Sequence, residues 1–382
     1  MSKRLRILFL VDFFSFYGGT EYINYNLLAG LKDLGHEIKV CVGERLSYET
    51  WADMIRAKNI ELFVSPNPYD TSDALEIHHS FLNNVVDRIT EQWKPDIIFS
   101  HPPGKLLIAF LKAHPDFHIP VIGMEYTVPG ENTRHWYHPA LPEIQNHITA
   151  YIAKCREAEE GIRKYFGYTG PIYCLPNLVA KAPNLGQCCS TDLLSVGCVG
   201  RLSPEKGIGF LLGAWKQVVS EIPAARLHIY GHGLYENYYQ ILTDNLGIRS
   251  SVFFEGTFHP ITGLNEIAEK HKIFIQPSLF ESIPNSMIEL MLRKKAFVAT
   301  NAGGIPELLR PEEGEGILVP PGSTDLLAEG ILRLLQNEVL ADSMAEKSYL
   351  HALDTYDYNR NISAYEKVFL EVAANYEQED TE

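Results

Sequence analysis

The sequence has few basic residues for its size: 33 lysines and arginines stand against 48 aspartates and glutamates, so that 382 residues carry a formal net charge of −15. This balance disfavours nucleic acid as a partner, because its phosphates would be repelled. Cysteine is also scarce, with six in the chain and no Cys-x-x-Cys pair, so we expect neither a zinc framework nor a disulfide scaffold. Cys41, Cys174 and Cys198 lie in apolar, strand-like runs, which predicts that all three are buried.

Long apolar runs are missing as well. No stretch approaches the roughly 20 apolar residues of a membrane span. Basic residues before Ile7–Val11 imitate a secretory leader, but Asp12 ends the apolar run below the ~7–15 residues that a leader contains. We therefore expect a cytoplasmic protein without a transmembrane segment.

Motifs for common cofactors are absent too. Gly231-x-Gly233 lacks the lysine and hydroxyl residue of a P-loop, and Gly18-Gly19 lacks the third glycine of a dinucleotide fingerprint. Both glycine pairs follow an apolar run, where they would let the backbone approach a ligand closely. The chain also has no Asp-x-Asp pair of carboxylates.

The dominant pattern is an alternation of short apolar runs with amphipathic helices. In the first half the strand-like runs are residues 6–11, 37–42, 60–64, 96–100, 121–124 and 148–153. In the second half they are residues 194–199, 226–230, 252–255, 273–276, 297–300 and 316–319. Such alternation predicts parallel sheets with helices on both faces. We expect an α/β chain of two doubly wound domains, joined by a linker at the polar run 181–186.

One stretch, residues 273–307, organises the second half. A buried strand leads into a loop where Pro284 suits the first turn of an apolar helix. The amides of Ile283–Ser286 would then point out of a helix N-terminus, which favours an anion such as phosphate. Glu281 and Glu289 have seven residues between them. Their carboxylates are better suited to binding the hydroxyl groups of a sugar than to binding a phosphate.

A second pair of charged residues follows the strand-like run that ends at Val199. Arg201 and Lys206 are five positions apart, at the carboxyl end of a strand, where open α/β sheets bind ligands. Arginine offers a planar fork and lysine a point charge, so together they could neutralise a diphosphate.

These motifs together resemble the retaining glycosyltransferases of family 4, which have the GT-B fold. The resemblance rests on Glu281, seven residues, Glu289 and then a strand ending in Gly303-Gly304-x-Pro306-Glu307. The family's Gly-Arg-Leu-x-x-x-Lys-Gly element is similar to residues 200–207, and its Gly-Gly-x-Glu element to residues 18–21. The likeness extends from Ile7 to about Val372.

The resemblance implies two Rossmann-like domains facing an interdomain cleft. Residues 1–180 would form the acceptor-side domain, completed by a C-terminal helix near 357–376, and residues 187–356 the nucleotide-sugar domain. The implied reaction is a hexosyl transfer, with retention of configuration, from a nucleoside-diphosphate sugar to an acceptor hydroxyl. UDP is favoured over GDP, and the acceptor is a small molecule, a glycan or a lipid-linked molecule. We expect no cofactor, and no metal, because Asp-x-Asp is missing beside Arg201 and Lys206.

The resemblance also implies roles for individual residues. Arg201 and Lys206 would stabilise the leaving diphosphate, Glu281 would bind the donor sugar, and Glu289 the ribose. The remaining donor-binding candidates are Gly18, Gly19, Gly231, Gly233, Glu255, Ile283, Pro284, Asn285 and Ser286. The aromatic pair next to Glu255, Phe253 and Phe254, is expected in the core instead.

The chain departs from the family pattern at four places, one of which is Leu178 in place of the glycine of a Pro-Asn-Gly turn. Ser282 replaces the glycine after the first glutamate, and Glu289-Leu-Met-Leu-Arg-Lys-Lys-Ala replaces Glu-Ala-Met-Ala-x-Gly-x-Pro. In the first domain Tyr126 takes the position of a histidine, with Glu125 beside it, so both are catalytic candidates and Tyr126 is favoured to face the ligand. Two alternatives stay open: a non-catalytic GT-B partner subunit and a nucleotide-sugar epimerase.

Overall fold

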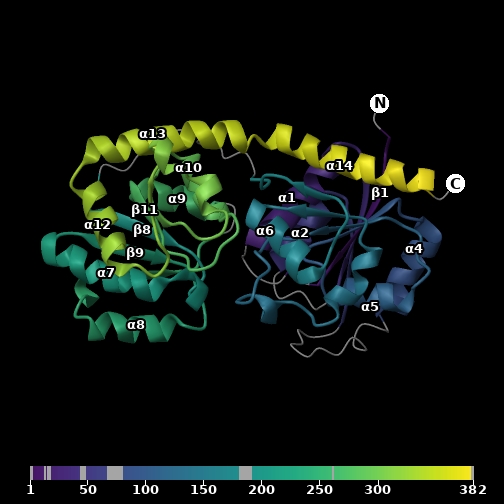
Figure 1. Ribbon diagram of the computed structural model, residues 1–382, viewed down its shortest axis with the longest axis horizontal. Coiled ribbons are helices and arrows are strands. Elements are labelled where there is room, and N and C mark those ends of the chain that lie inside the picture. The colour runs from purple at the N-terminus through teal and green to yellow at the C-terminus, as the bar shows by residue number, and fades with distance from the viewer. Residues whose placement is uncertain are drawn as a thin grey trace. The chain divides into compact units, whose positions relative to one another are not determined.

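The computed structural model of the protein describes residues 3–12, 14, 19–43, 49–66, 81–179, 192–259 and 262–379. The chain divides into two compact units (Figure 1). Unit 1 contains Met1–Leu178 and Tyr358–Glu382, and unit 2 contains Val179–Asp357. The polar run 181–186, predicted as the linker, lies outside the described residues, as does Gly18.

Unit 1 is built on a parallel sheet of seven strands in the order β3-β2-β1-β4-β5-β6-β7. The strands are β1 (Arg6–Val11), β2 (Glu37–Val42), β3 (Glu61–Val64), β4 (Ile97–Ser100), β5 (Val121–Met124), β6 (Ala150–Ala153) and β7 (Ile172–Cys174). The first six coincide with the apolar runs of the sequence to within two residues. β7 was not among the six runs predicted for the first half, although Cys174 was expected in a strand-like run, because it is an edge strand of only three residues. Cys174 on β7 is exposed, so its predicted burial is wrong, whereas Cys41 and Cys198 are buried.

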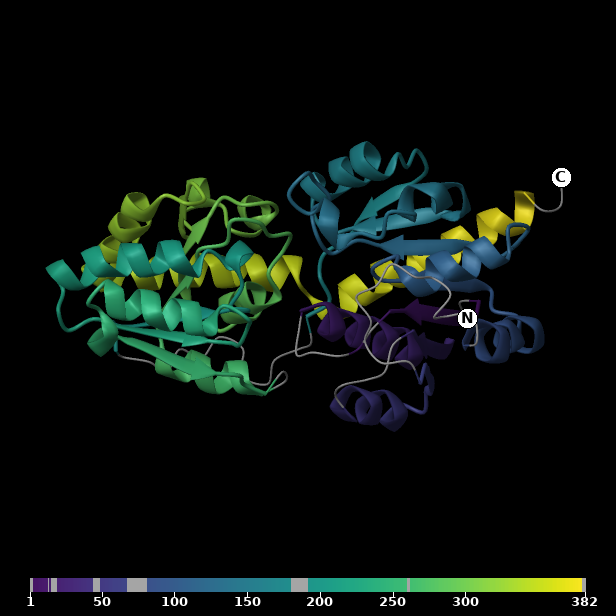
Figure 2. The same cartoon turned by 90° about the horizontal axis from the view of Figure 1, so that it is seen from below.

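The helices of unit 1 cover both faces of this sheet (Figure 2). They are α1 (Gly19–Asp33), α2 (Glu49–Ala57), α4 (Asp87–Trp93), α5 (Lys105–Ala113), α6 (Arg156–Gly161) and α14 (Tyr358–Glu379). Short 3-10 or π turns occupy Leu82–Val86, Arg134–Trp136, Leu141–His147 and Ile162–Phe166.

The last helix, α14, belongs to the core of unit 1 although it follows unit 2 in the chain. Ile362, Tyr365 and Phe369 are buried in one cluster with the strand residues of the sheet, and the ring of Phe369 lies 5.6 Å from that of Phe99 on β4. Burying a Phe side chain contributes roughly 1.5–3 kcal/mol. These buried residues form the face that attaches α14 to unit 1.

Unit 2 contains a parallel sheet of six strands in the order β10-β9-β8-β11-β12-β13. The strands are β8 (Ser195–Val199), β9 (Arg226–Tyr230), β10 (Val252–Gly256), β11 (Ile273–Gln276), β12 (Ala296–Thr300) and β13 (Ile317–Val319). The order reverses between β8 and β11. In open α/β sheets the carboxyl ends of the strands at such a switch point form the ligand site.

The helices of unit 2 are α7 (Ile208–Glu221), α8 (Glu236–Asn245), α9 (Gly263–Lys270), α10 (Asn285–Met291), α11 (Ile305–Leu308), α12 (Thr324–Leu335) and α13 (Glu338–Thr355). Short 3-10 turns occupy Pro204–Lys206, Arg249–Ser251 and Pro311–Glu313. α7 packs on α12, while α10 packs on α9 and α13. No helix in the described part of the chain is both long and apolar enough to cross a membrane.

One core prediction fails on β10. Phe254 packs against the core of unit 2, but Phe253 is 40% exposed and stacks on the ring of His228, with 4.9 Å between centroids. Successive side chains of a strand point to opposite faces. On the edge strand β10 only one of those faces meets the core.

α10 ends in a turn that normally requires glycine. Lys294 has φ +54°, and the amides of Lys294 and Lys295 donate to the carbonyls of Met291 and Leu290 at 2.9 and 3.2 Å. This is the Schellman arrangement. Lys294 takes the position of the glycine in the family pattern. The left-handed backbone conformation is costly for a residue with a Cβ, so Lys294 destabilises this turn relative to glycine.

We expect Lys294→Gly to be more stable than Lys294→Ala by about 1 kcal/mol, because both lose the side chain but only glycine relieves the backbone. Thermal unfolding of the two variants measures this difference. Both also lose the ion pair of the Lys294 Nζ with Glu346 at 2.6 Å, so Glu346→Ala serves as the control. Equal stability of the two variants would contradict the prediction.

Candidate functional site

The loops at the carboxyl edge of unit 2 approach each other too closely for side chains. A Cβ on Gly207, at φ +67°, would lie 1.9 Å from the carbonyl oxygen of Pro277, and one on Gly303, at φ +56°, 1.6 Å from that of Glu281. A contact this short is impossible, so both positions need glycine. These glycines lock the loops after β8, β11 and β12 together.

Gly231 and Gly233, which follow β9, also lie where a side chain would collide with the backbone of another loop. A Cβ on Gly231 would lie 1.9 Å from the carbonyl oxygen of Gly200, and one on Gly233 would lie 2.3 Å from that of Leu202. Their close approach is therefore to the backbone of the loop after β8. That they also line a nucleotide pocket stays a prediction.

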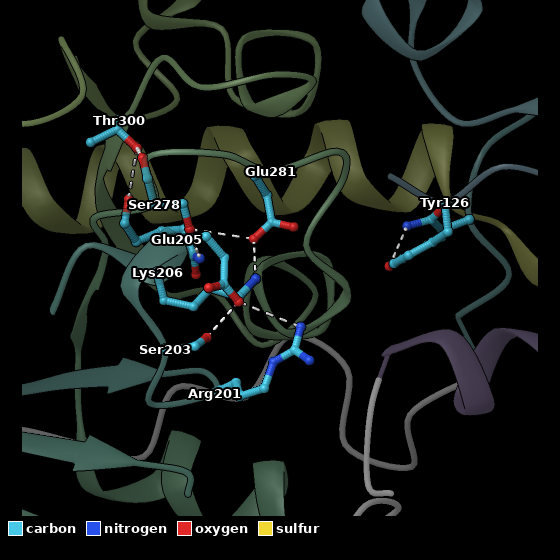
Figure 3. Close-up of polar contacts among 10 residues, drawn as sticks. Tyr126, Arg201, Ser203, Glu205, Lys206, Ser278, Glu281 and Thr300 are labelled. Atoms are coloured by element: carbon cyan, nitrogen blue, oxygen red, sulfur yellow. Dashed lines mark hydrogen bonds and ion pairs between the residues drawn. The ribbon is translucent and has the colours of Figure 1, made fainter. Parts of the chain in front are cut away.

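At the switch point, Lys206 and Glu281 form an ion pair between the Lys206 Nζ and the Glu281 Oε2 (Figure 3). Their side chains are only 18% and 10% exposed. The Ser278 hydroxyl also donates to the Glu281 Oε2 at 3.3 Å, and the Gln276 amide donates to the Ser278 hydroxyl at 2.8 Å. Glu281 is thus held from two sides, by the loop after β8 and by its own loop.

Arg201 lies in the same loop as Lys206, pairs with Glu205 and is far more exposed. Its Nη2 is 3.6 Å from the Glu205 Oε1, and 70% of its side chain is accessible. The Glu205 carbonyl oxygen accepts the amide of Leu279 at 2.8 Å, so Glu205 connects the loops after β8 and β11. Sequence analysis missed Glu205, because a glutamate between two cations resembles an ordinary surface residue.

The predicted anion loop leads into α10. Pro284 is the N-cap, with ψ 116°, and Asn285 is the first helical residue, so Pro284 lies one position before the first turn in which it was expected. Ile283 and Asn285 are buried, whereas Ser286 is half-buried. Anion binding by the amides of this segment is untested.

Glu289 lies one turn inside α10 and is 7% exposed. Burial raises the pKa of Glu289 to about 7, and the nearby guanidinium of Arg293 opposes that rise. The Arg293 Nη1 is 3.9 Å from the Glu289 Oε2. A buried carboxylate next to a fixed cation is the arrangement that keeps part of its charge near neutral pH.

The structure does not place Glu255 beside Lys206 and Glu281. It lies on the edge strand β10, two strands from β8, and its Oε1 is 2.7 Å from the Nδ1 of His228. Its predicted contact with the nucleotide stays a prediction. Gly19 is the first residue of α1 in unit 1.

In unit 1, Glu125 and Tyr126 follow β5 and have different environments. Glu125 is 1% exposed, and its Oε1 accepts the amides of Tyr126 and Thr127 at 3.0 and 2.8 Å and the Thr127 hydroxyl at 2.7 Å. Burial raises the pKa of Glu125 to about 7, although the donors of Thr127 lower it. Glu125 therefore braces the turn after β5.

Tyr126 is half-buried and contacts residues that follow two other strands of the sheet, β4 and β7. Its hydroxyl accepts from the Asn177 Nδ2 at 3.3 Å, and its ring meets that of His101 edge-on at 5.8 Å. Of the two candidates, Tyr126 has the more accessible side chain, in line with the sequence-based preference. Its catalytic role is untested.

Two residues at the same edge of unit 1 were missed by sequence analysis. His101 follows β4 and Lys154 follows β6, and both are buried. Burial lowers the pKa of His101 well below its ordinary value and that of Lys154 to about 7. The Lys154 Nζ donates to the hydroxyl of Tyr365 on α14. A polar residue directly after each apolar run was the available signal.

Comparison with known proteins follows the division into units. Residues 17–181 match the model "Glycosyltransferase Family 4", and residues 194–337 match "Glycosyl transferases group 1". The chain is a glycosyltransferase, and its first domain matches family 4. The glycosyltransferase character and the GT-B fold expected from the sequence are thereby confirmed.

Among curated relatives, a poly(ribitol-phosphate) α-N-acetylglucosaminyltransferase of Staphylococcus aureus is 27% identical over 185 residues, which is 48% of this chain and 36% of that protein. A GDP-mannose-dependent phosphatidylinositol monomannoside mannosyltransferase of Corynebacterium glutamicum is 27% identical over 163 residues, 41% of this chain and 42% of that protein. The chain thus spans less than half the length of either relative.

Solved structures agree on the fold over nearly the whole chain. Anabaena HepE, in complex with UDP and glucose, superposes with a TM-score of 0.78 at 19% identity, covering 96% of this chain and 99% of that one. Sucrose-phosphate synthase from Thermosynechococcus elongatus gives 0.77 at 16% identity, covering 97% and 100%. At such identities the likeness shows the GT-B fold alone.

Glu125 provides a test of the buried carboxyl in unit 1. Because its pKa lies above the ordinary 4.5, the folded protein holds a proton that the unfolded chain has released, so stability falls as pH rises from about 4.5 to 7. Glu125→Gln does not titrate, and its amide oxygen can still accept the same donors. We expect the free energy of unfolding of this variant to rise relative to that of the wild type, by on the order of 2 kcal/mol, as the pH increases from 5 to 8.

Urea unfolding at the two pH values measures the gap between Glu125→Gln and the wild type. A gap that moves in the opposite direction would mean that Glu125 is ionised in the folded protein throughout this range. Glu143→Gln, at an exposed carboxyl, is the control and should leave the pH dependence as it is.

Proposed function

We propose that the protein transfers a sugar from a nucleoside-diphosphate sugar to an acceptor hydroxyl, with retention of configuration. The observation that carries this proposal is the pairing of Lys206 with Glu281 at the switch point of unit 2. An ammonium group suits a diphosphate and a carboxylate suits sugar hydroxyls. A donor that joins a diphosphate to a sugar requires both groups side by side.

The reaction would proceed by stretching the bond between the anomeric carbon and the diphosphate oxygen. Negative charge then builds on the leaving diphosphate, and Lys206 and Arg201 stabilise it where it develops. The acceptor oxygen bonds to the anomeric carbon on the face from which the diphosphate departs, and its proton passes to a diphosphate oxygen. Glu281 holds the sugar hydroxyls during the transfer.

UDP is the favoured nucleotide and GDP the second. Structural neighbours bound to UDP support the first, and the GDP-mannose-dependent relative supports the second. Among the described residues no group of three or more His, Cys, Asp or Glu side chains could hold a metal ion. Metal independence, the acceptor and a cytoplasmic location stay predictions.

The deciding experiment combines ligand binding with donor turnover. Thermal shift with UDP, GDP and their sugars should identify the nucleotide, because a ligand that binds the folded state stabilises it. The cognate donor should be hydrolysed slowly without acceptor, also in excess chelator, and Lys206→Ala should lower that rate about 10²-fold or more.

Two outcomes of that experiment would contradict the proposal. Tight nucleotide binding without turnover of any donor favours the non-catalytic partner subunit. Conversion of the donor sugar into its epimer, with the diphosphate bond intact, favours the epimerase. Loss of activity in chelator, restored only by Mg²⁺ or Mn²⁺, would overturn metal independence alone.

The ion pair makes a further prediction about Glu281. A phosphate that reaches Lys206 comes close to the Glu281 carboxylate, and two like charges at 4 Å repel by about 4 kcal/mol at an effective dielectric constant of 20. We therefore expect Glu281→Gln to bind free UDP more tightly than the wild type, by roughly tenfold, while it turns over the sugar donor more slowly. Calorimetric titration measures the affinity.

Salt provides the control for this electrostatic argument. The gain in UDP affinity of Glu281→Gln should shrink in 1 M salt, where the Debye length is about 3 Å. An equal or weaker affinity at low salt would contradict the repulsion argument and would indicate that Glu281 bonds to the nucleotide itself.

A further inference from the structure

Arg293 is a buried arginine directly behind Glu289. It follows the C-cap of α10, four positions after Glu289, and only 4% of its surface is exposed. Arginine is almost never buried unless it is paired. The family pattern leaves this position unspecified.

The guanidinium of Arg293 is fixed by hydrogen bonds from two elements. Its Nε and Nη2 donate to the Asn265 Oδ1 on α9 at 2.9 and 2.6 Å. Its Nη1 donates to the carbonyl oxygen of Glu289 at 2.6 Å and lies 3.9 Å from the Glu289 Oε2. The planar fork therefore has one orientation, with the Nη1 beside the carboxyl group.

This geometry matters because an isolated buried carboxyl takes up a proton. A guanidinium stays charged at every relevant pH and favours the ionised carboxylate beside it. An ionised carboxylate can accept hydrogen bonds from two hydroxyl groups at once, whereas a protonated one has to donate its own proton. The charge state of Glu289 thus decides whether it can receive a diol.

We propose that Arg293 is a positioning residue that favours the ionised form of Glu289 and orients it to accept the ribose hydroxyls of the nucleotide. The inference rests on the proposed function, in which Glu289 binds the ribose. Arg293 acts through Glu289 and need not touch the ligand. If it served only to join α10 to α9, its loss would lower stability without changing how the protein distinguishes ribose from deoxyribose.

The test compares the affinities of UDP and 2′-deoxy-UDP by calorimetric titration of the full chain. We expect Arg293→Met, which is similar in length but uncharged, to weaken UDP binding about tenfold, the typical effect of losing one hydrogen bond to a charged group. Binding of 2′-deoxy-UDP should change far less. Arg293→Lys restores a charge and should recover part of the ribose preference.

A double-variant cycle separates action through Glu289 from a general loss of structure. In a Glu289→Gln background, Arg293→Met should cause no further loss of UDP affinity, because the group that it positions has already lost its charge. Arg333→Met, at an exposed arginine of α12, should leave both affinities unchanged. Thermal unfolding curves should show that each variant is still folded at the temperature of the titration, so that the affinities of folded proteins are compared.

The outcomes distinguish the two proposals. If the wild type binds UDP but Arg293→Met keeps the ribose preference, or weakens UDP equally with and without the Glu289 carboxylate, the role of Arg293 is overturned and the proposed function stands. If the wild type binds neither UDP nor GDP, the proposed function is overturned, and the role of Arg293 with it.

Discussion

The site of unit 2 depends on backbone contacts too close for any side chain. Gly207 and Gly303 allow the loops after β8, β11 and β12 to touch, and the Glu205 carbonyl adds a hydrogen bond between two of them. Because the loops are fixed to one another, the side chains that they carry have fixed distances. The Lys206–Glu281 ion pair is a consequence of this loop contact.

Buried charge is the second constraint. Lys206 compensates Glu281 and Arg293 compensates Glu289, so each glutamate of the motif has its own cation in unit 2. At Glu289 the guanidinium of Arg293 opposes the rise in pKa that burial causes, and an ionised carboxylate accepts hydrogen bonds from sugar hydroxyls better than a neutral carboxyl does. Because Lys206 is the cation that pairs with Glu281, the phosphate of a ligand and the Glu281 carboxylate would compete for it.

In unit 1 the polar residues at the carboxyl edge serve partly to hold the fold. Glu125 braces the turn after β5, and Lys154 bonds to Tyr365, which attaches α14. Tyr126 has an accessible ring among these buried groups. Since most polar side chains at this edge are buried, Tyr126 is the residue on which the predicted catalytic role of this unit is best tested.

The sequence by itself determined the α/β class, nearly every strand and the two glutamate and cation motifs, because apolar periodicity and glycine positions are local properties of the chain. It could not determine that Phe253 is exposed and Phe254 buried, nor that Cys174 lies on an edge strand, since strand order is not written in any local pattern. Only the tertiary structure placed Lys206 on Glu281 and the guanidinium of Arg293 on Asn265 of α9. Lys206 and Glu281 lie 75 positions apart in the sequence, and they meet because the loops that carry them are locked together. The contact between Arg293 and Asn265 depends on the packing of α10 on α9.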